Sequence, residues 1–347
     1  MTTQLNPQTY VMPPATKGEI VRLLSAKGVA QQDLFRAART TREAAGMQAV
    51  KLRGVIEISN YCQKSCGYCA IRPQNKALER YRMDIDTILS IAKGIQRQGI
   101  GTVFLQAGQD PKCDDQVCEA IPRIRALGVN VLLNLGEKPR DTYAAYAAAG
   151  ADSYILKYET SHATLYEKIV GTPLARRLEC TRWIQEVGMK LGTGNIIGLP
   201  EQTLDTLAED ILLSLSMQPD FVSSSPFIPN EYTPLVDLDP GSLQLTLNSI
   251  AICRLLFPTA LIPAVSALEK IQKGGQLMGL NAGANVLTIN FTPKNFRDKY
   301  AIYSQERFVV SQEHARAIVA DAGLQFLEVS EVQTQSSFPK VTSSLSG

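Results

Sequence analysis

A regular alternation of short β-rich runs and helical segments covers most of the chain and constrains its fold more than any other feature. Runs rich in β-branched and aromatic residues between turn residues predict strands. Apolar residues spaced three and four apart predict the helices between them. The eight predicted strands are 55–59, 102–106, 130–135, 153–158, 190–197, 221–227, 261–267 and 285–291.

Strands that alternate with helices predict a parallel sheet covered by helices. Eight is the number of strands that closes a (β/α)8 barrel of TIM type, and we therefore expect an α/β barrel fold. Periodicity alone leaves a doubly wound open sheet as the alternative. We expect an N-terminal helical extension at 1–50, the barrel at 51–330 and a disordered, Ser/Thr-rich tail at 331–347.

The overall composition argues against several functional classes. Hydrophobic residues make up 45% of the chain, charged residues make up 20%, and the net charge is +2. This balance is typical of a globular protein with a large core and does not indicate a nucleic-acid surface. The apolar runs are shorter than the roughly 18 to 20 residues of a membrane span, and the N-terminus lacks a hydrophobic signal core. We therefore expect a cytoplasmic protein that binds neither nucleic acid nor membranes.

The loop after the first predicted strand carries three cysteines, Cys62, Cys66 and Cys69, separated by three and then two residues. Loops at this end of barrel strands form the active site. Seven cysteines in 347 residues do not indicate a disulfide framework. A zinc site usually takes four Cys or His ligands, and the two histidines, His162 and His314, are distant in sequence. Three close thiolates suit three corners of a 4Fe–4S cluster, which leaves one iron open to a ligand.

This loop, with Tyr68 just before its last cysteine, resembles the signature loop of radical S-adenosylmethionine (SAM) enzymes. From about residue 53 to 293 the chain also resembles the branch that contains the FeFe-hydrogenase maturase HydE, methylornithine synthase and, more distantly, biotin synthase. The resemblance implies that the open iron binds the amino and carboxylate groups of SAM, which is cleaved to a 5′-deoxyadenosyl radical. It is carried by "ERYRM", "LQAGQDP", "NLGEKPR", "LKYETSHATLYEKI", "RRLEC", "GNIIGLPEQT", "PFIPNEYTPL" and "NAGANVLTINFTP".

The same resemblance implies roles for five further residues. Tyr68 would lie near the adenine, and Glu159 would bind the ribose hydroxyls, a task suited to a carboxylate acceptor. Arg177 would pair with the methionine carboxylate through its guanidinium fork. Gln109 stands where relatives often carry a glutamate beneath the methionyl amino group. Gly198 belongs to the segment whose backbone would contact adenine. Without the resemblance, Glu159 and Arg177 would be interpreted as solvated side chains.

A small amino-acid-like or thioether-containing substrate is implied inside the barrel, together with a reducing partner such as ferredoxin or flavodoxin. The candidate residues of this substrate chamber are Tyr158, Ser266, Glu269, Asn290 and Thr292. A HydE-like reaction is the preferred interpretation. A methylornithine-synthase-like carbon-skeleton mutase, sulfur insertion of the lipoyl or biotin synthase type, and a non-catalytic iron-sulfur scaffold are the alternatives. His162 is predicted to lie on the surface at a helix start.

The other four cysteines fall into two groups. Cys180 and Cys253 lie among apolar residues of predicted helices and are expected in the core. Cys113 and Cys118 follow the second predicted strand, on the active-site side. They are either incidental thiols or an accessory metal or redox pair, and if the pair held a cluster, a sulfur-inserting reaction related to lipoyl synthesis would become a candidate again.

Overall fold

The computed structural model describes residues 13, 14, 16–302 and 307–327. The predicted tail at 331–347 lies outside these residues. Seven parallel strands in the described part form one sheet in the order β6-β5-β4-β3-β2-β1-β7. They are β1 (Lys51–Ser59), β2 (Thr102–Ala107), β3 (Asn130–Asn134), β4 (Ser153–Ile155), β5 (Lys190–Ile197), β6 (Phe221–Pro226) and β7 (Val286–Asn290).

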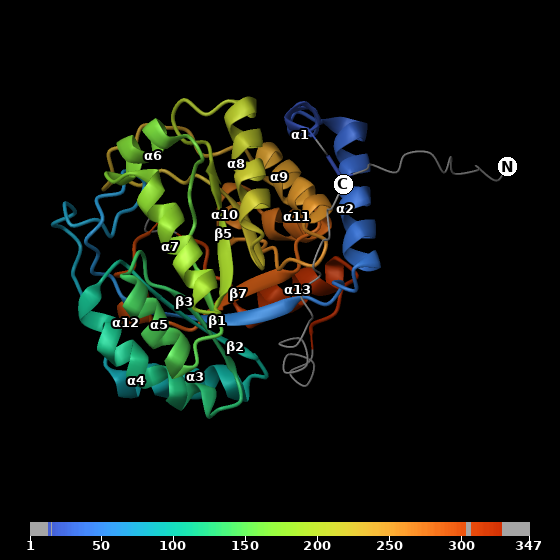
Figure 1. Cartoon of the computed structure of the whole chain (residues 1–347). Helices are drawn as coiled ribbons and strands as arrows, with labels where there is room; N and C mark the ends of the chain where they lie inside the picture. The colour runs from blue at the N-terminus through green and yellow to red at the C-terminus, as the bar shows by residue number, and fades with distance from the viewer. Residues whose placement is uncertain (1–12, 15, 303–306, 328–347) are drawn as a thin grey trace.

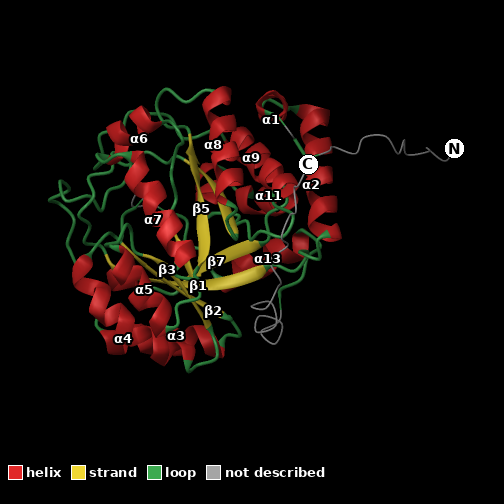
Figure 2. Cartoon of the chain, in the orientation of Figure 1, coloured by secondary structure: helices red, strands yellow, loops and turns green. Residues whose placement is uncertain are grey.

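Helices surround the sheet on its outer face, so the predicted α/β barrel class is confirmed (Figure 1 and Figure 2). The larger helices that follow strands are α3 (Ile85–Arg97), α4 (Asp114–Arg125), α5 (Arg140–Ala149), α6 (Ala163–Val170), α7 (Leu174–Glu186), α8 (Leu204–Met217) and α9 (Leu243–Leu256). The remaining helices are α10 (Ser266–Ile271), α11 (Gly275–Asn281), α12 (Lys294–Arg297) and α13 (Gln312–Asp321).

Two helices precede β1, as the sequence predicted for residues before 50. They are α1 (Lys17–Leu24) and α2 (Gly28–Ala44), and they pack outside α8 and α9 (Figure 1). Thr16 caps α1 through a reciprocal capping box with Glu19. None of the helices in the described ranges combines the length and the apolar character that crossing a membrane requires.

The predicted strand at 261–267 is not a regular strand. Single parallel bridges join Leu261 to Phe221 of β6 and Pro263 to Val286 of β7. Pro263 has no backbone N–H to donate, and α10 begins at Ser266, so the ladder cannot extend further. The two bridges connect the edge strands only where β6 and β7 begin, which closes the ring at its amino-terminal end.

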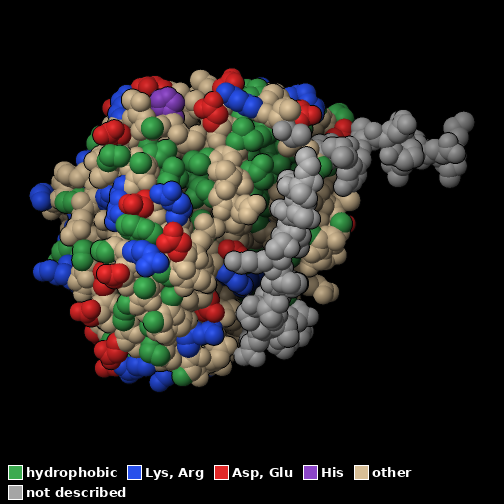
Figure 3. Space-filling view, viewed as in Figure 1, with side chains coloured by type: hydrophobic (Ala, Val, Ile, Leu, Met, Phe, Trp, Pro, Cys, Tyr) green, Lys and Arg blue, Asp and Glu red, His purple; other side chains and the backbone are tan. Residues whose placement is uncertain are grey.

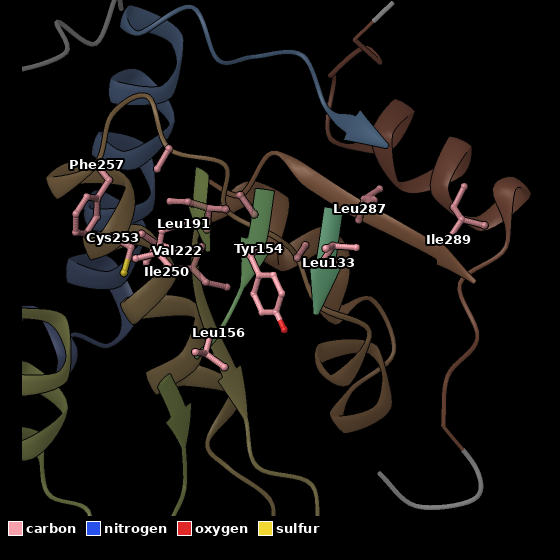
Figure 4. Close-up of a cluster of buried hydrophobic side chains, with 14 of the residues drawn as sticks. Leu133, Tyr154, Leu156, Leu191, Val222, Ile250, Cys253, Phe257, Leu287 and Ile289 are labelled. Atoms are coloured by element: carbon pink, nitrogen blue, oxygen red, sulfur yellow. The ribbon is translucent and has the colours of Figure 1, made fainter. Parts of the chain in front are cut away.

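Most apolar side chains of the strands pack outward against the helices. Figure 4 shows part of this outer core, in which Leu191 and Val222 of the sheet lie near Ile250 and Cys253 of α9. The side chains that point inward alternate with them, because successive residues of a strand face opposite sides. Only a small cluster of Val55, Phe104, Leu132 and Ile155 fills the inside. The barrel interior therefore keeps space above this cluster.

Candidate active site

Two adjoining cavities occupy the barrel interior and its carboxyl-terminal mouth. The upper cavity has a volume of about 220 Å³ and the lower one about 180 Å³. Both are lined by Gln106, Asn134, Lys157, Ser225 and Ile302, so they meet at these side chains. A ligand in the upper cavity would therefore face a second ligand in the lower one.

All three cysteines of the motif line the upper cavity. The Cys62 thiol accepts hydrogen bonds from the backbone N–H groups of Lys64 (3.4 Å) and Gln109 (3.3 Å). The loop itself is held by Arg80, whose guanidinium donates to backbone carbonyls of residues 60, 71, 72 and 75 at 2.6–3.1 Å. One arginine thus fixes both ends of the cysteine-bearing loop.

The chemistry of the three thiols fits an iron-sulfur cluster. Burial raises the pKa of Cys66 to about 11 and that of Cys69 further, and negative charge on the neighbouring cysteines adds to both shifts. Thiolates in such a site need a cationic partner. No three Cys, His, Asp or Glu side chains of the described residues converge on a single-ion position. Three thiolates that each bind a different iron of a cubane would have a cationic partner and would not need to converge on a single ion.

Glu159 presents a strained, incompletely partnered carboxylate to the upper cavity. Its φ angle is +65°, in the left-handed region that a glutamate rarely adopts. Oε1 accepts a hydrogen bond from the Tyr68 hydroxyl at 3.1 Å. Oε2 lies 3.3 Å from Nζ of Lys157 but accepts no hydrogen bond from the described residues. Backbone strain together with an unsatisfied buried acceptor is typical of a ligand-binding group.

Arg177 of α7 is buried and lines the same cavity. Its Nε donates to Oε1 of Glu137 at 2.8 Å and its NH1 to the Lys157 carbonyl at 2.7 Å. Glu137 also pairs with Lys64 at 2.7 Å. Burial alone would lower the pKa of the Arg177 guanidinium, but Tyr166 and Glu137 beside it produce a net rise. Sequence reasoning assigns no role to Glu137 or Lys64, although Lys64 lies in the cysteine loop and Glu137 in "NLGEKPR".

Of the two remaining predicted SAM contacts, Gln109 lines the upper cavity and Gly198 does not. Oε1 of Gln109 already accepts from the Glu137 N–H at 3.0 Å, so one acceptor site and the amide NH2 group are left for a ligand. Gly198 does not line the cavity, and its N–H donates to Gln202 at 2.8 Å. Ile196 is the residue of β5 that reaches the lining. Both roles stay predictions.

Two of the predicted chamber residues, Ser266 and Asn290, line the lower cavity. Tyr158 does not, and this expectation is corrected: its hydroxyl lies against α8, 2.6 Å from the Asp210 carbonyl. Successive residues of an extended segment face opposite sides, so Lys157 points inward where Tyr158 points outward. The sequence predicts that neighbouring residues of this segment face opposite sides, but it does not predict whether Lys157 or Tyr158 faces inward.

Thr292 and Glu269 also lie outside the cavity lining, which corrects the expectation for both. The Thr292 hydroxyl accepts from the Glu57 N–H at 2.9 Å and so ties the end of β7 to β1. The Glu269 carboxylate accepts from the N–H groups of Gly274 and Gln276 at 2.7 and 3.1 Å, which caps α11. Both side chains are therefore structural.

The lower cavity carries charged residues that the sequence did not predict. Arg53 of β1 is 8% exposed, lies over the Phe104 ring at 5.1 Å and donates to Thr288 at 2.6 Å. Within the described residues it pairs with no carboxylate, and burial lowers its pKa to about 10. Glu57 is instead neutralised by a two-pronged ion pair with Arg307, at 2.5 and 2.6 Å. Arg53 is the cation left to interact with a ligand.

Cys113 and Cys118 do not line either cavity. The Cys113 thiol is buried and donates to Asp110 at 3.2 Å. Cys118 lies five residues further along, roughly 140° around a helix axis, and packs against the outer core. This arrangement favours incidental thiols over an accessory metal pair. Cys180 and Cys253 are buried in the core, which confirms that prediction.

His162 caps α6, and its Nδ1 accepts from the Leu165 N–H at 3.1 Å. The side chain is exposed, as predicted for a surface helix start. On the face shown in Figure 3, basic and acidic side chains are interspersed with hydrophobic ones.

Comparison with known proteins assigns the family. The model of the radical SAM superfamily matches residues 56–213. The chain is 38% identical to the [FeFe] hydrogenase maturase subunit HydE of Thermotoga maritima, over 81% of this chain and 82% of the relative. It is 31% identical to 3-methylornithine synthase of Methanosarcina acetivorans, over 74% of each. The crystal structure of methylornithine synthase matches with a TM-score of 0.81 and 25% identity, covering 92% of this chain and 96% of that one. With its three cysteines in one cavity of a parallel barrel, the chain belongs to the radical SAM superfamily and is an enzyme of that superfamily.

Proposed function

We propose that the protein is a HydE-like radical SAM enzyme, which cleaves SAM reductively and directs the 5′-deoxyadenosyl radical to a small substrate in the lower cavity. One observation carries the proposal: three cysteine thiols, a strained Glu159 and a buried Arg177 line one cavity that adjoins a second, charged one. A 4Fe–4S cluster, when bound, supplies the electron for this cleavage.

In this proposal Cys62, Cys66 and Cys69 each bind one iron, and the fourth iron is open to the amino and carboxylate groups of SAM. Arg177 attracts the same carboxylate, because Glu137 and a carbonyl occupy only part of its guanidinium. SAM would thus be held at its methionine end by the cluster and by one cation.

The nucleoside end of SAM would lie beside Tyr68 and Glu159. Oε2 of Glu159 is buried without a hydrogen-bond donor among the described residues, and ribose hydroxyls would supply one. The Tyr68 hydroxyl holds Oε1 at 3.1 Å and keeps the other oxygen turned to the cavity. Glu159 contacts Lys157, which lies at the boundary of the two cavities, so these contacts would hold the nucleoside end of SAM beside the lower cavity.

The test of this proposal is reductive cleavage of SAM. We expect anaerobically reconstituted protein, given dithionite and SAM, to release 5′-deoxyadenosine and methionine in equal amounts. Omission of dithionite is the control and should stop the release. A fully reconstituted protein that binds iron but releases no 5′-deoxyadenosine would instead support an iron-sulfur scaffold. Replacing dithionite by reduced ferredoxin or flavodoxin tests the proposed reducing partner.

The buried cations of the lower cavity support an amino-acid-like substrate. Arg53 has no carboxylate partner among the described residues, and a buried cation is costly unless a ligand pairs with it. Lys157 lies at the boundary of the two cavities and already contacts Glu159. An α-carboxylate on Arg53 would direct the rest of an amino acid upward, toward Lys157 and the SAM site.

A carbon-skeleton mutase of the methylornithine synthase kind is the second candidate. The observation that favours it is the match to the methylornithine synthase structure, which covers nearly the whole of both chains. The unbranched isomer of 3-methylornithine is lysine, which would fit the same carboxylate site. Sulfur insertion gains no comparable support, because none of the described cysteines lines the lower cavity.

Arg53→Met should remove carboxylate binding in the lower cavity. We expect L-lysine or L-cysteine to raise the melting temperature of the wild-type protein, whereas their methyl esters, which lack the carboxylate, do not. The variant should lose the response to the free acids, since methionine fills the space without charge. Thermal shift measurements check this, and a full response in the variant would contradict the assignment. The amino acid that binds more tightly separates the two candidate functions.

A further inference from the structure

Asp210 of α8 is a buried carboxylate outside both cavities that the proposed chemistry does not use. It is 0% exposed, and no Lys, Arg or His of the described residues forms an ion pair with it. Burial raises its pKa to about 6, although four neutral groups donate to it. A buried carboxylate without a cation is costly, and such a group is retained where it fixes local structure.

The donors to Asp210 all come from the surroundings of Glu159. The Ser161 N–H and hydroxyl donate to Oδ1 at 2.6 and 2.7 Å, and the Thr160 hydroxyl at 3.4 Å. The Asn195 amide of β5 donates to Oδ2 at 3.1 Å. Asn195 is also the residue that pairs with Glu159 in a parallel bridge.

The backbone on the other side of Glu159 reaches the same helix. The Tyr158 hydroxyl donates to the Asp210 carbonyl at 2.6 Å. Glu159 therefore lies between segments that are bound to one residue of α8. The regular strand β4 has ended at Ile155, so the sheet holds this turn through the isolated bridge between Glu159 and Asn195 and not through a continuous ladder.

Such a connection explains how Glu159 keeps a φ angle of +65°. A non-glycine residue stays in this region only where its surroundings fix it. Its own N–H donates to the Gly194 carbonyl at 3.1 Å, and its carbonyl accepts from the Ile196 N–H at 2.8 Å. These two bonds hold the peptide to β5, whereas the bonds to Asp210 hold the residues that follow it. The turn aims the carboxylate into the cavity and sends Thr160 and Ser161 outward.

We propose that Asp210 is a positioning residue for SAM, because it fixes the left-handed turn at Glu159 and so directs the Glu159 carboxylate toward the ribose. The inference rests on the proposed function. It extends the site outward from the cavity to α8, through side chains that never contact SAM.

Asp210→Ala and Asp210→Asn test this role in the full-length, reconstituted protein. The alanine variant loses both carboxylate oxygens and keeps only the backbone carbonyl that accepts from Tyr158, and we expect its KM for SAM to rise about ten-fold or more, with a smaller change in kcat. The asparagine variant keeps Oδ1 for Ser161, and the Asn195 amide can rotate to accept from the new NH2 group. Its KM should stay within about three-fold of wild type. The electron paramagnetic resonance signal of the reduced cluster without SAM should be unchanged in both.

Asp152→Ala is the matched control. Asp152 is a partly buried carboxylate just before β4, at the opposite end of the barrel, and it accepts from the Val131 N–H at 2.7 Å and pairs with Arg125 at 3.0 Å. Its loss should lower stability but leave the KM for SAM unchanged. Equal KM values in Asp210→Ala and wild type, or equal rises in Asp210→Ala and Asp152→Ala, would overturn the inference.

Two milder variants keep the test decisive if Asp210→Ala does not fold. Ser161→Ala and Asn195→Ala each remove one donor, and each should raise the KM for SAM about three-fold. Wild-type KM values in both would overturn the inference. Failure of the wild-type protein itself to bind or cleave SAM would overturn the proposed function, which is a separate outcome.

Discussion

Alanine in place of Cys62, Cys66 or Cys69 is expected to abolish cluster assembly and SAM cleavage together. All three thiols line the upper cavity, and each would bind a different iron, so no other thiol can replace a missing one. Iron and sulfide content, visible absorption and 5′-deoxyadenosine release measure the two losses. We expect single variants to retain less than about one tenth of the wild-type activity, a loss of more than about 1.4 kcal/mol in transition-state stabilisation.

The chain offers a matched control for this prediction. Cys113→Ala and Cys118→Ala make the same substitution at cysteines that lie outside both cavities. They should leave iron content and SAM cleavage at wild-type levels. Stoichiometric iron in a Cys62/Cys66/Cys69 triple alanine variant, lost on further removal of Cys113, would contradict the assignment of a single cluster site.

Arg254→Ala is expected to cause the largest loss of stability. Arg254 of α9 is fully buried and donates to the Gly283 carbonyl at 2.9 Å, the Pro258 carbonyl at 2.7 Å and Oδ1 of Asn285 at 2.9 Å. The same Asn285 oxygen accepts from the Ile262 N–H at 2.9 Å, beside the two bridges that close the barrel. The substitution removes the guanidinium donor from the Gly283 and Pro258 carbonyls, leaves Asn285 Oδ1 with one donor in place of two, and opens a cavity.

We expect the free energy of unfolding to fall by about 3 to 5 kcal/mol, because unpaired buried carbonyls and a large cavity each cost several tenths to a few kcal/mol. That is a large part of the roughly 5 to 15 kcal/mol that stabilises a domain. Urea denaturation of the cluster-free protein measures it. Arg123→Ala, which removes an arginine 48% exposed, is the control and should change the value by less than about 1 kcal/mol. A wild-type urea midpoint in Arg254→Ala would contradict the role of Arg254 in closing the barrel.

Sequence reasoning located the cysteine loop and the strands because both signals are local. Three cysteines within eight residues identify the cluster loop without any knowledge of distant contacts. The run at 261–267 shows where a local signal fails, since its composition favours a strand while Pro263 and the start of α10 stop the ladder. Propensity indicates a strand, but tertiary hydrogen bonding decides whether one forms.

The orientation of side chains could not be predicted from the sequence, for a different reason. Tyr158 and Lys157 are neighbours, and which of them faces the chamber depends on how the segment after β4 meets β5. The positive φ angle of Glu159 results from the contact between this segment and β5, because glutamate itself rarely adopts it. Asp210 could not be connected to Glu159 from the sequence, because the two lie on different elements with β5 between them.

The sequence by itself therefore determined the α/β class, the family to which the chain is similar and the three cysteines that we propose as cluster ligands. Only the tertiary structure decided that Arg53 faces the lower cavity without a carboxylate partner among the described residues, that Glu137 joins Arg177 to Lys64, and that the Asp210 carboxylate accepts hydrogen bonds from Ser161. Periodicity and motif spacing can be recognised within one segment of the sequence. Charge pairing and burial depend on contacts between segments that the fold brings together.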